Sequence, residues 1–424
     1  MEKNVSFQID NTILNGKLIY GNGGKNDIKC TLFKANSAVL QNLFENRSIF
    51  KICGTWDNTR EFTALKCDVR DGIINFFQYL FIDKKSELPY KIDIGKLYLN
   101  TSDVNDEMSV KKIDVKFSPI DQWIPNDENK KFFIKENDCY ITLSNNFITI
   151  ESSLVVTLKQ LDQILFNLQV FFEVLVLNNE VKSIKKYIYT VDDTQIEEVM
   201  RYKSEEPTKK EFLFRYDTNR IEDILNRWFE AKNTYGKIFD YLSGILNESS
   251  AEYLELKFLM FAQWIEAYSG EKFKGQKKQF EKEERNIKEN IKQIIGKIEN
   301  DEDKKLVQQY CKFNNEDTFT KKVKFLFING ILNDIFDFSN HEEKLDIFIN
   351  DIKKYRNHLT HINIKDDLNN TQMLNLYEIL KDMIYILLMS ELKVTVEEKH
   401  ITEIKRKYIK YTNLQASIQK CNDK

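Results

Sequence analysis

HEEKLDIFINDIKKYRNHLTH, residues 341–361, is the stretch that decides the fold of the second half of the chain. Its apolar residues recur at steps of three and four, the period of one helix face. The members of this stripe are Leu345, Phe348, Ile349, Ile352 and Tyr355. A helix with such a stripe buries it against other helices. The polar segment Arg356 to His361 follows directly, so we expect it at the end of a packed helix.

The sequence around this stretch is helical in pattern from about residue 211 onward, and it contains no proline there. The expected helices cover about 220–246, 250–269, 276–299, 302–312, 318–337, 341–361, 367–391 and 396–411. We therefore expect residues 206–424 to form an all-α helical bundle.

The first part of the chain has a different pattern, and all four prolines lie in it. Short apolar runs bounded by turn residues predict strands around 11–20, 28–33, 48–54, 61–67, 73–82, 91–99, 110–118 and 131–153. A helix near 157–177 should follow a Thr157-x-x-Gln160 capping box. The polar stretch 202–208 reads as a linker. The predicted fold class is α+β multidomain, with a β-rich domain at residues 1–205, acting as a sensor or regulator, before the helical domain.

Composition excludes several classes of protein. The N-terminus lacks the apolar run of a signal peptide, and the apolar stretch 164–177 is interrupted by polar residues and is short for a membrane span. We therefore expect a soluble, cytoplasmic protein. The six cysteines contain no C-x-x-C pair, which argues against a zinc site and a disulfide framework. The formal net charge of −3 means that any nucleic-acid binding must come from local patches.

Arg356 and His361 have the chemistry that RNA cleavage needs. A base must take the proton of the ribose 2′-hydroxyl, an acid must protonate the leaving 5′-oxygen, and a cation must stabilise the charged phosphorane. Histidine exchanges protons near neutral pH, and arginine can hold two phosphate oxygens. An arginine and a histidine are therefore sufficient for this reaction, which requires neither a metal ion nor another cofactor.

Helix geometry limits what one copy of the segment can do. On a continuous helix Asn357 and His361 share a face, whereas Arg356 and His361 are about 140° apart. Either the helix frays near Thr360 or the groups converge with a second copy across a two-fold axis. We favour the second arrangement, because one histidine cannot readily serve as base and acid in one step.

The segment Arg356-Asn357-His358-Leu359-Thr360-His361 resembles the R-N-x-x-x-H form of the motif of HEPN domains, which are helical ribonucleases of prokaryotic defence and toxin systems. The helix at 258–268 looks like the one that packs against the motif helix in those domains. The hairpin from Ile52 to Cys67 and the later segment Ile120-Asp121-Gln122-Trp123 resemble the N-terminal domain of ApeA-like abortive-infection proteins. The resemblance covers essentially the whole chain.

The resemblance implies a catalytic set of Arg356, Asn357 and His361, in which Asn357 assists the other two. It places Glu266 and His358 in supporting positions. Glu266 would orient the motif, or it is a solvated residue or a core-edge ion pair, and His358 has a surface or packing role as its alternative. The resemblance further implies a homodimer or higher homo-oligomer through the helical domain, RNA and in particular tRNA as the substrate, and a phage protein as a possible trigger.

A basic run near the C-terminus is a second candidate RNA contact. Lys405, Arg406, Lys407 and Tyr408 interleave cations with a ring, and rings can stack on bases. The alternative interpretation is a plain helix face. For the whole protein, the alternative function is a non-catalytic oligomeric interaction or sensor module that recognises a phage or host ligand.

Overall fold

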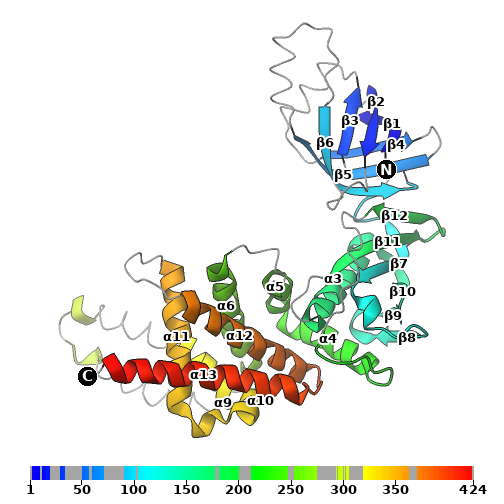
Figure 1. Ribbon diagram of the computed structural model, residues 1–424. Helices are drawn as coiled ribbons and strands as arrows, with labels where there is room; N and C mark the ends of the chain where they lie inside the picture. The colour runs from blue at the N-terminus through cyan, green and yellow to red at the C-terminus, as the bar shows by residue number, and fades with distance from the viewer. Residues whose placement is uncertain are drawn as a thin grey trace. The chain divides into compact units, whose positions relative to one another are not determined.

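The computed structural model describes residues 2–9, 12–19, 29–33, 50–56, 60–70, 90–101, 104–176, 181–199, 212–246, 253–274, 319–361 and 370–422, with a few positions between 293 and 304. Two compact units divide the chain (Figure 1). The β unit comprises Met1–Phe172 and Val181–Asn226, and the helical unit comprises Glu173–Glu180 and Arg227–Lys424. The predicted order of a β-rich part followed by a helical part is confirmed. The predicted domain boundary at 205/206 lies outside the described residues.

The first six strands of the β unit pair antiparallel in the order β3-β2-β1-β4-β5-β6, and a further pairing of β3 with β6 closes them into a ring. Their bounds are Glu2–Ile9 (β1), Thr12–Ile19 (β2), Lys29–Phe33 (β3), Phe50–Trp56 (β4), Arg60–Arg70 (β5) and Tyr90–Leu99 (β6). The predicted hairpin at 48–54 and 61–67 is confirmed as β4 and β5. The predicted strand at 73–82 lies outside the described residues.

The remaining strands extend from β6 in the order β12-β11-β7-β10-β9-β8, again antiparallel. They are Ser109–Ser118 (β7), Asn129–Ile134 (β8), Cys139–Ser144 (β9), Ile148–Thr157 (β10), Lys182–Thr190 (β11) and Gln195–Val199 (β12). Helix α3, Leu158–Leu175, follows β10. Its capping box is confirmed, because the Thr157 amide donates to Gln160 Oε1 at 2.8 Å and the Gln160 amide donates to Thr157 Oγ1 at 3.3 Å.

Aromatic packing joins α3 to β7 and to the short 3₁₀ helix η1, Ile120–Gln122. The Trp123 ring lies edge-on to Phe171 and Phe172 at centroid distances of 6.4 and 6.3 Å. Its indole N–H donates to the Phe214 carbonyl at 2.9 Å, so the polar edge of the ring is also satisfied. The tryptophan segment that the sequence singled out is therefore a core element of the β unit.

Buried charge lies between α3, β11 and β12. Lys186 Nζ is 2.7 Å from Asp162 Oδ1 and 2.7 Å from Glu198 Oε2, and its side chain is 6% exposed. Burial alone would lower the pKa of Lys186, but the attraction of the two carboxylates outweighs it and raises the pKa. We call Lys186, Asp162 and Glu198 the lysine-centred triad.

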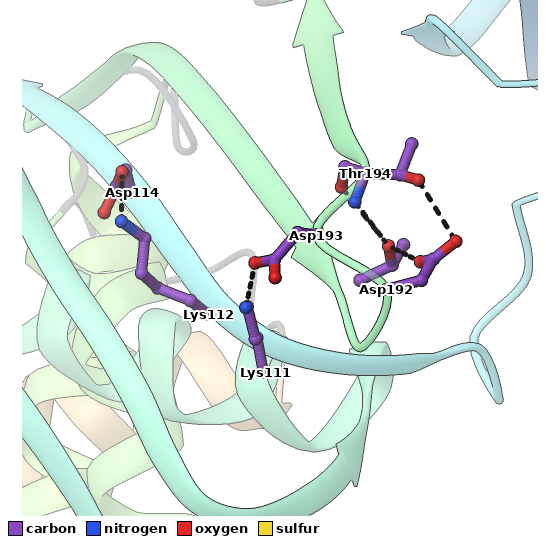
Figure 2. A network of polar contacts seen from close by, with 7 residues as sticks. Lys111, Lys112, Asp114, Asp192, Asp193 and Thr194 are labelled. Carbon is purple, nitrogen blue, oxygen red and sulfur yellow. Dashed lines mark hydrogen bonds and ion pairs between the residues drawn. The ribbon is translucent and has the colours of Figure 1, made fainter.

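Surface polar contacts fasten the β11–β12 turn to β7 (Figure 2). Asp193, in the left-handed region at φ +65°, pairs with Lys111. Within the turn, Thr194 Oγ1 donates to Asp192 at 3.2 Å. On β7, Lys112 Nζ lies 3.1 Å from Asp114. Of these contacts, the pair of Lys111 with Asp193 joins the turn to β7.

From α4 onward the described residues contain only helices as longer elements. They are α4 (Ile221–Tyr235), α5 (Lys237–Leu246), α6 (Leu254–Lys272), α9 (Phe319–Ile328), α10 (Ile331–Phe336), α11 (Glu342–His361), α12 (Asn370–Glu391) and α13 (Glu398–Asn422). The predicted helix at 220–246 is two helices, because Gly236 adopts φ +51° and its amide donates back to the Lys232 carbonyl. The predicted helix at 318–337 is also two helices, which meet at Gly330.

The core of the helical unit forms around α12, whose side chains are buried on nearly every face. The predicted stripe of α11 is confirmed, since every member is buried. Helix α13 runs well past the predicted end at residue 411. Most of the predicted helices at 276–299 and 302–312 lies outside the described residues.

No helix in the described ranges combines the length and the apolar composition that crossing a bilayer would require.

Candidate functional site

The motif segment lies on the last turns of α11. The backbone is helical through Thr360, whose hydroxyl donates to the Arg356 carbonyl at 2.8 Å, and α11 ends at His361. The fraying near Thr360 that the sequence left open is therefore absent. Positions 357 and 361 consequently lie on one face of the helix, and position 356 lies on another.

Arg356 is held by side chains of two other helices. Its Nη2 donates to Glu266 Oε2 of α6 at 2.7 Å, and its guanidinium carbon lies 5.0 Å from the ring centroid of Phe319 on α9. The first contact is a charge-assisted hydrogen bond, and the second is a cation–π contact. The side chain is still 27% exposed, although its Nε is buried without a hydrogen-bond partner in the described part of the chain. Arg356 is thus oriented and partly open to solvent.

Glu266 also binds a second cation. Lys322 Nζ of α9 lies 3.3 Å from Glu266 Oε1, so the two carboxylate oxygens serve two different cations. Glu266 is 21% exposed and Lys322 is 30% exposed. We call Arg356, Glu266 and Lys322 the glutamate-centred triad. Its formal charge is +1, and it lies where α6, α9 and α11 meet.

Lys322 is not among the residues that the sequence pattern indicates for the site. The residue lies 34 positions before Arg356, and only the packing of α9 brings it to the site. The sequence does indicate a local excess of positive charge here, because the α9 sequence FTKKVKFLFI has three lysines and no acidic residue.

Asn357 and His358 are both half-buried. The Nδ1 atom of His358 is buried and has no hydrogen-bond partner within the described ranges. Neither residue contacts the glutamate-centred triad through a hydrogen bond or ion pair. The side chain of His361 lies outside the described residues, so the structure fixes the position of His361 on the helix and nothing more.

A second polar cluster holds the part of α11 that precedes the motif. The Tyr355 hydroxyl donates to Gln372 at 2.9 Å, and Gln372 in turn donates to Gln415 at 3.3 Å. The Tyr411 hydroxyl donates to Asp351 Oδ2 at 2.7 Å. Burial raises the pKa of Asp351, and this hydrogen bond counteracts only part of the rise. The cluster ties α11 to α12 and α13.

The predicted RNA contacts on α13 do not form one surface. Tyr408 is 4% exposed, and the centroid of its ring lies 5.3 Å from the ring centroids of Phe338 and Phe348. This burial argues against base stacking by Tyr408. Lys407 Nζ pairs with Asp382 at 2.8 Å.

The other two members of the basic run differ in exposure. Arg406 is exposed and Lys405 is half-buried. These two cations remain the accessible part of the predicted α13 contact.

Ligands for a metal ion do not gather in the part of the chain that the structure describes. No three His, Cys, Asp or Glu side chains there lie close enough to hold a cation.

The comparison with protein families matches this region. The family model described as Apea-like HEPN matches residues 259–398, which include all three members of the glutamate-centred triad and the motif segment. The helical unit therefore contains an Apea-like HEPN domain, and the resemblance of the sequence to HEPN domains is confirmed for these residues. The basic run at 405–408 lies outside the matched range. A search of curated proteins and a search of solved structures each gave no match.

Proposed function

We propose, with the Apea-like HEPN domain at residues 259–398 as the premise, that the chain is a metal-independent endoribonuclease of an antiphage, abortive-infection system. The observation that carries the proposal is Arg356, oriented by Glu266 and Phe319 at the end of α11 and still partly exposed. A cation held in this way is preorganised for the charge that develops on a phosphorane.

The proposed reaction needs proton transfer and charge stabilisation only. A base removes the proton of the ribose 2′-hydroxyl, and the 2′-oxygen attacks phosphorus as the bond to the 5′-oxygen breaks. The leaving 5′-oxygen accepts a proton. The products are a 2′,3′-cyclic phosphate and a 5′-hydroxyl. We assign proton transfer to His361, phosphate binding to Arg356 and support of the reacting groups to Asn357.

The helical backbone through Thr360 favours a composite site. On one helix positions 356 and 361 are about 140° apart around the axis, so we place a two-fold axis near the end of α11 that would bring Arg356 of one copy toward His361 of the other. The proposed enzyme is therefore a homodimer or a larger homo-oligomer through the helical unit. The proposed substrate is host RNA, with tRNA as the leading candidate, and a phage protein is the proposed trigger.

The direct test is RNA cleavage without free metal. Purified protein is incubated with total tRNA and EDTA, next to an Arg356→Ala/His361→Ala variant of matched thermal stability. We expect cleavage by the wild type and none by the variant. Cleavage that requires a divalent cation, or that survives the double substitution, contradicts the proposal. Phage protection that persists in a His361→Ala protein would instead favour the non-catalytic interaction module.

A mixing experiment tests the composite site. Arg356→Ala and His361→Ala proteins are each inactive in this account, but a mixed oligomer contains one intact Arg356 and one intact His361. If the pair converges across the two-fold axis, mixing restores part of the cleavage activity. A mixture as inactive as its two components would place both groups in one copy.

A further inference from the structure

We infer that Lys322 is a phosphate-binding residue of the same site, so that Lys322 and Arg356 together hold the RNA backbone. This inference rests on the proposed ribonuclease function and deepens it. It starts from the charge of the glutamate-centred triad, where one carboxylate faces two cations.

The geometry leaves donors on both cations. An ammonium has three N–H groups and a guanidinium has five. The contacts with Glu266 use one oxygen for each cation, at 3.3 Å for Lys322 and at 2.7 Å for Arg356. About a quarter to a third of each cationic side chain is exposed. A phosphodiester with one negative charge matches both the +1 formal charge and the remaining donors.

The backbone of Lys322 is also held in place by a contact with α6. The Ser269 hydroxyl of α6 donates to the Lys322 carbonyl at 2.6 Å, and Ser269 is buried. Ser269 lies three residues after Glu266, so the two share a face of α6. Helix α6 thus contacts both the backbone and the ammonium of Lys322. A lysine held at both ends loses little conformational freedom when it binds a ligand.

The position on α9 adds further positive potential. Lys322 is the fourth residue of α9, and Phe319, which lies under Arg356, is the first. The amino end of a helix carries a partial positive charge, which is felt within its first turn. Both cations therefore lie near an end that attracts anions.

The competing interpretation is that Lys322 only neutralises Glu266. Salt dependence separates the two, because each cation that binds a single-stranded phosphate makes log K fall with log [salt] by about 0.7. We propose to measure binding of a fluorescent single-stranded RNA at several NaCl concentrations. The protein is the full chain with His361→Ala, which prevents turnover. Lys322→Gln is compared with Lys322→Arg, and Lys324→Gln is the matched control.

Lys324 is suited to this control because it lies on the same helix, is 28% exposed and pairs with Asp346 and Glu342. We expect Lys322→Gln to flatten the salt slope by about 0.7 per contact and to weaken binding about five-fold at 0.1 M salt. Lys322→Arg and Lys324→Gln should keep the original slope. Lys322→Met, which retains the apolar stem, replaces Lys322→Gln if thermal melting shows that the glutamine variant is unfolded.

The outcomes separate the inference from the function on which it rests. An unchanged slope in folded Lys322→Gln or Lys322→Met, with normal RNA binding by the parent, overturns the role of Lys322 and leaves the ribonuclease proposal intact. A flattened slope also in Lys324→Gln overturns it too, since any lysine on α9 would then do. Loss of RNA binding in the parent, together with no cleavage by the wild type, overturns both.

Discussion

The two units contain ion-pair triads of opposite construction. In the lysine-centred triad of the β unit, one cation serves two carboxylates, and its ammonium is almost completely buried. In the glutamate-centred triad of the helical unit, one carboxylate serves two cations, and both remain partly exposed. The first arrangement leaves no open cation for a ligand. The second leaves charge and donors accessible, so we expect mutations to affect stability in the first triad and activity in the second.

The largest expected effect comes from Lys186→Met in the β unit. Removing the central cation leaves Asp162 and Glu198 without their buried partner, which typically costs about 3–5 kcal/mol of unfolding free energy. Denaturant unfolding measures the loss. Lys112→Met is the control, because Lys112 is 31% exposed against 6% for Lys186, and its pair with Asp114 should contribute less than about 1 kcal/mol. Equal losses in the two variants would remove the distinction between buried and exposed pairs.

The pH dependence of this effect follows from the raised pKa of Lys186. The folded state binds the proton more tightly than the unfolded state, so the stabilisation is fully present below the unfolded pKa of about 10.4. It is lost only as the pH rises through the folded value. The difference between wild type and Lys186→Met should therefore stay constant from pH 6 to pH 9.

Glu266→Gln is expected to have an intermediate effect, on activity. The substitution removes the charge that orients Arg356, and a small misplacement of a catalytic group can reduce the rate by about 10–100-fold. The unfolding free energy should change by no more than about 1 kcal/mol, since the triad is partly solvated. Single-turnover cleavage measures the rate. Glu342→Gln, which removes one of the two carboxylates that pair with Lys324 on the same helix, should cleave like the wild type. A Glu266→Gln enzyme at full rate would show that Arg356 needs no positioning.

The smallest expected effect is that of Asp351→Asn. Because burial raises the pKa of Asp351, the folded state prefers the protonated form, and ionisation reduces stability as the pH rises above about 4. Asparagine keeps an acceptor for Tyr411 without the charge. The variant should therefore melt slightly above the wild type at pH 7, and the difference should vanish near pH 3. A variant that melts lower at pH 7 would mean that the ionised carboxylate is stabilising.

Periodicity predicted the parts of the fold that carry continuous apolar patterns. The burial of the α11 stripe is confirmed, as are the β4–β5 hairpin and the capping box of α3. Strands β11 and β12 were missed, because buried Lys186 and Glu198 occupy positions where the pattern would need apolar residues. Each makes the burial of the other possible, and this compensation appears only in three dimensions.

The candidate site was predictable where its residues lie close in sequence or where the resemblance to HEPN domains placed them. Glu266 was named as a possible partner of the motif, and its contact with Arg356 is observed. Lys322 was not, since its position depends on how α9 packs on α6. Tyr408 had a visible core pattern, because Ile404, Tyr408 and Tyr411 recur at helical spacing and are all buried. The cations between these residues obscure that pattern in the sequence.

The most direct test of the central claim is to sequence RNA ends in cells after induction of the wild-type protein and of Arg356→Ala, at equal levels of folded protein. The account predicts new 2′,3′-cyclic phosphate and 5′-hydroxyl ends with the wild type and none with Arg356→Ala. The same ends in both samples, or wild-type ends that carry a 3′-hydroxyl, would contradict a metal-independent cleavage site at Arg356.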